Sequence, residues 1–181
     1  MTFETERLLL RPWKESDAED LYKYASNPEV GIPAGWQPHT SIENSIEIIR
    51  TVFSTPEIYA VCLKEDGKAI GCAGFHRNDI ASKSDEYELG YWIGKPFWGK
   101  GLIPEASHEL LRHAFEDLNM NTIWCGHYDG NIKSRRVQEK LGFAFHHTTE
   151  GLEVLGEIRT GHVMFMTHKM WSERKNYALE H

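Results

Sequence analysis

The sequence predicts a single domain that combines helices with a β-sheet, of the α/β or α+β class. Its 181 residues match the usual size of one domain. Segments rich in β-branched and aromatic residues alternate with segments of helical periodicity, and no linker or repeat interrupts them. We expect the domain to span residues 1–178, because residues 179–181 resemble the remnant of an expression tag.

Charge and composition exclude several classes of protein. The 20 basic and 27 acidic residues give a formal net charge of −7, which repels nucleic acid and anionic lipid and favours cationic partners. No apolar run approaches the roughly 18 residues of a membrane span, and Glu4 and Glu6 stand where a signal peptide is basic. Cys62, Cys72 and Cys125 form no C-x-x-C pair and lie in apolar runs, as reduced, buried thiols do. We expect a cytoplasmic protein that binds neither nucleic acid nor membranes.

The first half of the chain is predicted to contain two helices and three strands. Apolar runs, caps and helix breakers predict a strand over residues 8–11, a helix from Ser16 or Asp17 to about residue 24 that Asn27-Pro28 ends, a loop over 31–40, a helix from Ser41 that Pro56 closes, and a hairpin of strands 59–64 and 69–76.

The second half continues the alternation of strands and helices. The pattern predicts a strand over 86–93, a helix that begins just after Gly101 and reaches about residue 118, a strand over 122–125, a helix over 131–141 that Gly142 stops, and closing strands over 143–148 and 162–169. In the strand 86–93, a period of two places Glu86 and Glu88 on the face opposite to Tyr91.

A glycine-containing loop is expected between the strand 86–93 and the following helix. Its sequence is Trp98-Gly99-Lys100-Gly101-Leu102. Free amides and a helix dipole at such a position favour a phosphate or pyrophosphate, although a plain tight turn has the same composition. The segment also matches part of the phosphate loop of nucleotide triphosphatases, but Gly101 stands in place of the Ser or Thr that would hold Mg²⁺. A nucleotide-binding protein is therefore an alternative, but the glycine at this position argues against it.

Two polar residues open the helix over 131–141. Asn131 and Ser134 are three residues apart on its first turn and therefore face the same way, so they can meet a ligand together. The alternative is purely structural, with Asn131 as a helix cap and Ser134 as a tolerated small residue.

Taken in order, these motifs resemble the GNAT acyltransferase family. The segments that carry the resemblance are Glu88-Leu89-Gly90-Tyr91-Trp92-Ile93, the loop 98–102, residues 131–143 and the opening segment 5–12. The similarity is strongest to the branch of ribosomal-protein-alanine N-acetyltransferases. It implies a mixed, mostly antiparallel central sheet of about seven strands, flanked by helices. It also implies that the fourth and fifth strands, here 86–93 and 122–125, splay apart around acetyl-CoA.

The resemblance also implies which residues hold acetyl-CoA. Its pantetheine arm would bond like an added strand to the backbone of Tyr91, Trp92 and Ile93. Its pyrophosphate would rest on the amides of Trp98, Gly99, Lys100, Gly101 and Leu102. Asn131 and Ser134 would approach the pantetheine and the thiol. No metal is expected.

The chemistry requires a base for the amine and a donor for the departing thiolate. Glu88 is our candidate base, with Glu86 on the same face as the second choice. Many members of the family carry a Tyr seven residues after the helix-opening Asn, and this chain has Gln138 there, which is no acid at neutral pH. Ser134 is the substitute that the resemblance implies, followed by Tyr128.

The predicted function is therefore acetyl transfer from acetyl-CoA to a primary amine. The acceptor is a protein N-terminus, with a basic ribosomal protein favoured by the acidic charge, or a small amine. The alternative is a module of the same fold that binds acyl-CoA without catalysis. A homodimer is possible if the strand 162–169 has an exposed edge.

Two further groups of residues were considered for the site. Trp13, Trp36 and Trp92 could line an acceptor pocket or belong to the core. His146 and His147 are adjacent on a predicted strand and should face opposite sides, which argues against joint metal binding.

Overall fold

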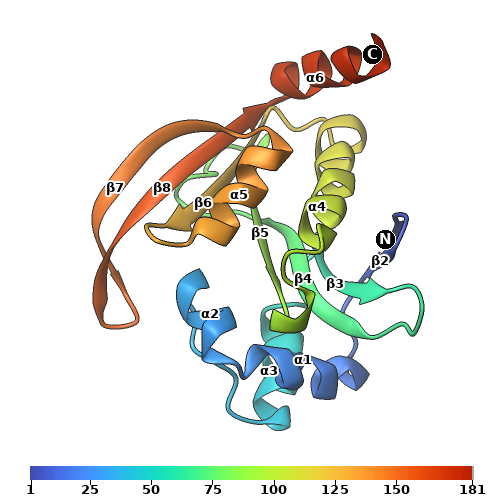
Figure 1. Ribbon diagram of the computed structural model, residues 1–181, viewed down its shortest axis with the longest axis vertical. Helices are drawn as coiled ribbons and strands as arrows, with labels where there is room; N and C mark the ends of the chain where they lie inside the picture. Colours follow the sequence, from blue (N-terminus) through green and yellow to red (C-terminus); the bar gives the residue numbers. More distant parts are fainter. Residues whose placement is uncertain (181) are drawn as a thin grey trace.

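The protein folds into an eight-stranded sheet flanked by helices (Figure 1). The structure is a computed structural model that describes residues 1–180, and the side chains of residues 1–174. His181, part of the predicted tag remnant, lies outside the described residues. The strand order is β1-β2-β3-β4-β5-β6-β8-β7, with the β5–β6 pair parallel and the other neighbours antiparallel. The predicted mixed, mostly antiparallel sheet is confirmed.

The strands are β1 (Phe3–Glu4), β2 (Leu8–Arg11), β3 (Ile58–Leu63), β4 (Ala69–His76), β5 (Glu86–Ile93), β6 (Thr122–Tyr128), β7 (Ala144–Val154) and β8 (Glu157–Thr167). The α-helices are α1 (Ala18–Ala25), α2 (Pro28–Ala34), α3 (Ile42–Thr51), α4 (Leu102–Arg112), α5 (Ile132–Leu141) and α6 (His168–Glu180). Two 3₁₀ turns, Glu15–Asp17 and Lys95–Phe97, precede α1 and α4, and a π-helix, His113–Asp117, extends α4. None of the described helices is long and apolar enough to cross a membrane.

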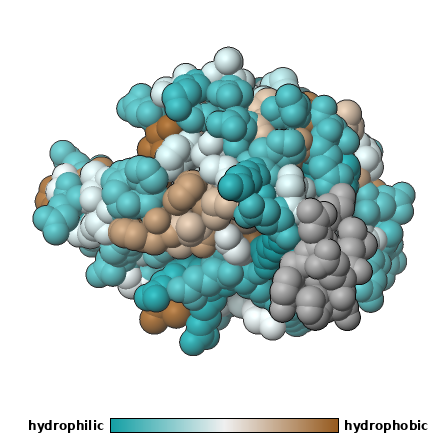
Figure 2. Space-filling model, turned by 90° about the horizontal axis from the view of Figure 1, so that it is seen from above, coloured by the Kyte–Doolittle hydropathy of each residue, from teal (hydrophilic) through white to brown (hydrophobic). Residues whose placement is uncertain are grey.

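Helices cover both faces of the sheet, because side chains alternate along each strand. On β3, Val61 belongs to the core under α4, whereas Ala60 and Cys62 belong to a second core under α1 and α3. The sheet is therefore the middle of three layers. Seen from above, most of the surface is hydrophilic, with a hydrophobic band near the centre and smaller separate hydrophobic patches (Figure 2).

The sheet is split in its centre. β5 and β6 pair over only three residue pairs, in which Glu86 to Glu88 face Thr122 to Trp124. Beyond them β5 continues to Ile93 along β4, while β6 continues along β8. The predicted splay is confirmed. The split strands are the fifth and sixth because the two-residue β1, which the sequence does not signal, adds one strand.

The expected loop over residues 31–40 is wrong in its first part. Pro28 occupies the first turn of α2, where its missing N–H breaks no helical bond, and the Asn27 side chain caps the helix by accepting from the Glu29 amide. The pair follows the end of α1 at Ala25, as predicted, and also begins the next helix. Gly35, at φ 89°, then stops α2.

The closing hairpin is longer than expected. β7 and β8 each span 11 residues and join near Gly156, whereas shorter strands over 143–148 and 162–169 were predicted. β8 lies between β6 and β7 and is paired on both edges, so the exposed edge on which pairing of the last strand across a dimer would depend does not exist on this strand. The outer edge of the sheet at this end is β7 instead (Figure 1).

Candidate active site

A large cleft opens where β5 and β6 separate. It is bounded by α4 and α5 on one side and by α2 and the segment after it on the other, and its volume is about 1960 Å³. Sites for one small ligand usually measure roughly 300–1,000 Å³. The cleft therefore has room for two substrates at once.

The glycine loop presents its backbone to one end of this cleft. Gly99 and Gly101 have φ of 74° and 73°, and α4 starts at Leu102 as predicted. Within the described part of the chain, no acceptor engages the amides of residues 99–103. Free amides at a helix N-terminus suit the oxygens of a pyrophosphate. The side chain of Lys100 lies over the Phe97 ring, and Lys100 is absent from the cleft lining, so its ammonium group is not part of this end of the cleft.

Three basic side chains of α5 line the same end of the cleft. They are Lys133, Arg136 and Lys140. The Lys133 ammonium lies 4.2 Å from the centre of the Trp98 ring. The sequence analysis did not single out these residues, because their convergence on the glycine loop depends on how α5 packs beside α4. Together they make this end complementary to phosphate.

The free edge of β5 forms the inner wall of the cleft. Tyr91, Trp92 and Ile93 all line it, and among the described residues no strand pairs with this edge beyond Glu88. The Ile93 carbonyl already accepts a hydrogen bond of 2.9 Å from the Trp98 indole. This bond fixes the loop to the strand and leaves the second lone pair of the Ile93 carbonyl for a ligand.

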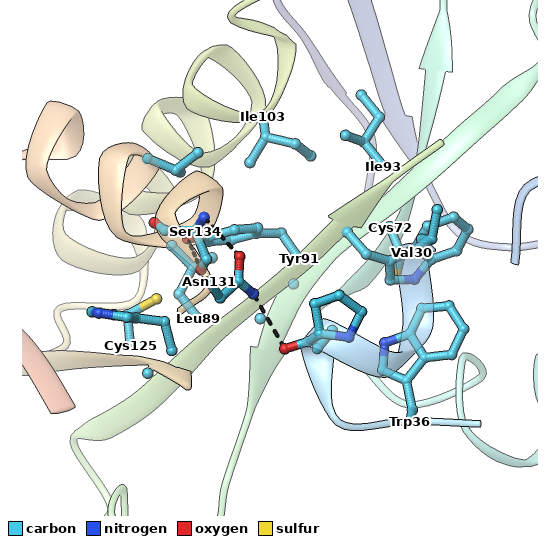
Figure 3. Close-up of a pocket in the computed structure, with 18 of the residues that line it drawn as sticks. Val30, Trp36, Cys72, Leu89, Tyr91, Ile93, Ile103, Cys125, Asn131 and Ser134 are labelled. Carbon is cyan, nitrogen blue, oxygen red and sulfur yellow. Dashed lines mark hydrogen bonds between the residues drawn. The ribbon is translucent and has the colours of Figure 1, made fainter. Parts of the chain in front are cut away.

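Ser134 lies on the α5 side of the cleft in a small polar cluster (Figure 3). Its hydroxyl oxygen is 3.0 Å from the Tyr91 hydroxyl and accepts from the Gln138 amide nitrogen at 3.2 Å. Burial raises the pKa of Tyr91 well above its usual value, so this phenol keeps its proton at neutral pH. The Tyr91 hydroxyl is a polar group of the site that the sequence analysis missed, because it assigned Tyr91 a backbone role only.

Asn131 has both ends of its amide engaged (Figure 3). Its oxygen caps α5 by accepting from the Ser134 amide, and its nitrogen donates to the Pro33 carbonyl, each at 3.2 Å. The Arg159 side chain also holds the C-terminal end of α2, because it donates to the Ile32 carbonyl at 2.6 Å. Asn131 therefore joins α2 to α5 across the cleft. Its observed contacts are those of a helix cap, the structural role that was the alternative to ligand binding.

Gln138 is fully buried behind Ser134. Its amide nitrogen donates to the Gly126 carbonyl at 2.9 Å, and its oxygen lies 2.7 Å from Nδ1 of His127. Burial lowers the pKa of His127, so the ring is neutral near pH 7, with its hydrogen on Nδ1. Gln138 thus stands where much of the family has Tyr, but as a buried hydrogen-bonding group.

Glu88 is at the point where the strands part. Its side chain is 15% exposed, accepts from the Asn78 amide, and lies 3.2 Å from His76 Nε2. It shares the cleft with Ser134 but projects from the opposite face of β5 to Tyr91. Glu86 is buried, pairs with Lys83 at 3.1 Å and does not line the cleft. The second choice of base is therefore wrong, because Glu86 lies in the closed part of the β5–β6 pair.

The three tryptophans considered for the acceptor pocket fall into two groups. Trp36 and Trp92 line the cleft on the far side from α5 and meet edge to face, with ring centres 5.6 Å apart. Trp13 is buried in the second core, stacked on Phe53. Tyr128 also lines the cleft, next to Arg159, and no hydrogen bond joins it to Ser134.

The two adjacent histidines do not face opposite sides. A β-bulge between Phe145 and His147 breaks the alternation, and the Nδ1 atoms of His146 and His147 lie 2.7 Å apart. The expectation based on strand period is therefore wrong here. Among the described residues, no group of three His, Cys, Asp or Glu side chains could hold a metal ion.

The cysteines are free and buried. Burial raises the pKa of Cys62 to about 11 and that of Cys72 to about 12. Burial, followed by the nearby Glu88 carboxylate, raises the pKa of Cys125 as well. None of the three is a nucleophile at neutral pH, although Cys125 lines the cleft.

A split sheet, an amide cradle and a cleft for two substrates define an acyl-transferring enzyme. The chain belongs to the GNAT acetyltransferases, because the family's domain, described as Acetyltransferase (GNAT) domain, matches residues 7–144. It is 31% identical over 147 residues to p20, an uncharacterised N-acetyltransferase of Bacillus licheniformis, covering 78% of this chain and 82% of the relative. It is 26% identical over 137 residues to the [ribosomal protein uS5]-alanine N-acetyltransferase of Escherichia coli, covering 76% of this chain and 63% of the relative.

Solved structures show the same fold. A GNAT acetyltransferase from Bacillus anthracis superposes with a TM-score of 0.82 at 22% identity, covering 93% of this chain and 99% of the other. A ribosomal-protein-S5-alanine acetyltransferase from Vibrio fischeri superposes with a TM-score of 0.75 at 21% identity, covering 94% of this chain and 98% of the other. These structures show the fold, and the family match together with the p20 relative makes the protein an N-acetyltransferase. Nothing in these comparisons supports the nucleotide-binding alternative.

Proposed function

We propose that this protein transfers the acetyl group of acetyl-CoA to a primary amine by direct attack within a ternary complex. The observation that carries the proposal is the separation of β5 from β6 directly after Glu88, with free amides at one end of the gap. Aligning two bound reactants in such a gap supplies about 7–11 kcal/mol of a reaction barrier.

The residues present fit acetyl-CoA as a substrate. The amides of residues 99–103 and the cations Lys133, Arg136 and Lys140 suit its phosphates. The unpaired edge of β5 at Tyr91, Trp92 and Ile93 suits the amides of its pantetheine arm. The loop and the strand edge therefore accommodate the two ends of one extended molecule.

We assign the catalytic roles to Glu88 and Ser134. The amine nitrogen forms a bond to the thioester carbonyl carbon and loses a proton to Glu88, directly or through a water. The carbon–sulfur bond then breaks and its electron pair stays on sulfur. Ser134 donates a hydrogen bond to that sulfur, and the released thiolate takes a proton from solvent. The opposite-face placement of the two side chains suits an amine and a thioester that approach the gap from its two sides.

The acceptor is proposed to be a protein N-terminus or a small amine. Two of the relatives are named for acetylating ribosomal-protein alanine, which supports a basic protein substrate in the cytoplasm. The net charge of −7 also favours a cationic partner. If two copies associate, the edge strand β7 is the surface we propose, because Phe145 on it is 58% exposed.

The test mixes the protein with acetyl-CoA and a panel of small amines and N-terminal peptides. Thiol release and a mass gain of one acetyl group on an acceptor are the expected results. Tight binding of CoA in calorimetry with no thiol release from any acceptor would instead favour the non-catalytic acyl-CoA-binding module.

A further inference from the structure

We propose that Gln138 and Tyr91 are positioning residues that direct the hydroxyl proton of Ser134 into the cleft, toward the sulfur of bound CoA. This inference rests on the proposed function of the cleft. It assigns a role to the residue that replaces the family's tyrosine and to a phenol for which no role was expected.

The orientation of the Gln138 amide is fixed by two partners. The Gly126 carbonyl can only accept, so the group that lies 2.9 Å from it must be the amide NH₂. Nδ1 of the neutral His127 ring, 2.7 Å from the other end, donates to the amide oxygen. The second hydrogen of the NH₂ group is therefore free to donate to Ser134 Oγ at 3.2 Å. Gln138 can act on Ser134 only as a donor.

Tyr91 approaches Ser134 from the strand side. Its hydroxyl lies 3.2 Å from the Ser134 carbonyl oxygen, which can only accept, and 3.0 Å from Ser134 Oγ. Either hydroxyl can be the donor in the contact between Tyr91 and Ser134 Oγ. We take Tyr91 as the donor, with its one proton shared between the backbone and side-chain oxygens of Ser134. In that arrangement, Gln138 and Tyr91 both supply hydrogens to the protein side of Ser134 Oγ.

A hydroxyl has one proton and two lone pairs. With Gln138 donating to Ser134 Oγ and Tyr91 taken as a second donor to it, the serine proton has no carbonyl or carboxylate to bond within the described residues. Ser134 lines the cleft, whereas Gln138 lies behind it. A sulfur that gains negative charge in the cleft is then the acceptor for this proton. Electron density drawn from Oγ by two donors also makes its O–H a stronger donor.

The test follows the ionisation of the CoA thiol on the enzyme, which requires no acetyl transfer. The ultraviolet absorbance of the thiolate is recorded against pH for CoA bound to each variant. In the unmodified protein, the bound thiol should ionise at a lower pH than free CoA. That shift should vanish in Ser134→Ala and shrink in Gln138→Met and Tyr91→Phe. Tyr87→Phe is the matched control, because it removes a phenol from the same strand outside the cleft lining.

Turnover gives a second readout. Gln138→Met and Tyr91→Phe should each lower kcat about tenfold, less than the roughly 10²–10³-fold loss typical of removing a direct donor, with KM for acetyl-CoA unchanged. Gln138→Glu keeps the size of the side chain and adds a titration. Its protonated form can donate as the amide does, whereas its ionised form can only accept and would capture the serine proton. Its activity should therefore fall as the pH rises through the pKa of the new carboxyl.

The proposal is overturned if Gln138→Met and Tyr91→Phe leave the thiol titration as it is in the unmodified protein, or if Ser134→Ala does. A pH profile of Gln138→Glu parallel to that of the unmodified protein would also contradict it. A lowered thiol pKa with no acetyl transfer to any amine would overturn the proposed reaction and leave this inference intact.

Discussion

Glu86 and Glu88 lie two residues apart on one face of β5, yet their surroundings differ. Glu86 is held by Lys83 in the closed part of the sheet, and Glu88 opens onto the cleft. The difference arises because the β5–β6 pairing stops at Glu88. The two residues are chemically identical, so the sequence could not distinguish their roles. The point at which the β5–β6 pairing ends distinguishes them.

The pair permits a matched test of the base. Glu88→Gln should lower kcat by about 10²–10⁴-fold, the usual contribution of general base catalysis, and leave CoA binding unchanged. Glu86→Gln, whose amide oxygen can still accept from Lys83, should retain full activity. Steady-state kinetics and calorimetry with CoA measure both effects. Equal losses in the two variants would contradict the assignment of Glu88.

The carboxylate of Asp17 joins the 3₁₀ turn that precedes α1 to Arg11 of β2. Burial acts to raise the pKa of Asp17, but hydrogen bonds from Arg11 and from the Lys14 amide outweigh it, and the net pKa is lowered. A lowered folded-state pKa means that Asp17 contributes stability above its unfolded pKa of about 3.9, and that this stability is lost as pH falls through the folded value.

Asp17→Asn should therefore destabilise the protein at pH 7 by roughly 3 kcal/mol, the lower end for breaking a buried ion pair. The difference in unfolding free energy between Asp17→Asn and the unmodified protein should shrink below about pH 3.9, where Asp in the unfolded chain is protonated. Urea unfolding at both pH values measures it. Glu15→Gln, in an exposed pair with Arg50, is the control and should change stability little. A penalty for Asp17→Asn that persists unchanged at low pH would contradict this account.

The elements that form the cleft were largely predictable from sequence. The bounds of β5, the start of α4 after Gly101 and the caps of α5 at Asn131 and Gly142 all agree with the structure. Local signals set these features: an alternating pattern, a positive φ and a capping side chain. The split of β5 from β6 came from the family resemblance, because no local signal marks where two strands part.

Other elements were missed for physical reasons that can be named. Asn27-Pro28 follows the end of α1, as predicted, and also begins α2, a second role that is supported by the packing of α2 beside β5 and β6. The bulge beside His147 and the length of the β7–β8 hairpin depend on pairing between strands. The cluster around Ser134 joins β5, β6 and α5, so single-chain spacing could not reveal it.

The glycine loop can be tested against a hairpin of the same geometry. Gly99 and Gly67 have φ of 74° and 72°, and an added Cβ would meet nothing within 4 Å at either position. Alanine at either site should therefore lower the free energy of unfolding by a similar amount, about 1–2 kcal/mol, because it must adopt the left-handed conformation. Only Gly99→Ala should also weaken CoA binding, because it strains the amide cradle. Thermal unfolding and calorimetry separate the two effects, and equal CoA affinities would count against the cradle.

Across the whole molecule, acidic residues outnumber basic ones by seven. Because long-range attraction is screened by salt, KM for a lysine-rich N-terminal peptide should rise severalfold between low and physiological salt, while kcat stays constant. KM for an uncharged peptide of equal length should change little. Kinetics with both peptides across a salt series provide the measurement. Identical salt dependence for the two would remove electrostatics as a basis for choosing the acceptor.

The central claim is that the gap between β5 and β6 holds CoA. A crystal structure of the complex with CoA tests it most directly. The account predicts the pyrophosphate on the amides of residues 99–103, the pantetheine arm along the free edge of β5, and the sulfur within hydrogen-bonding distance of Ser134 Oγ. CoA bound outside this gap, or β5 and β6 paired along their full length in the complex, would contradict it.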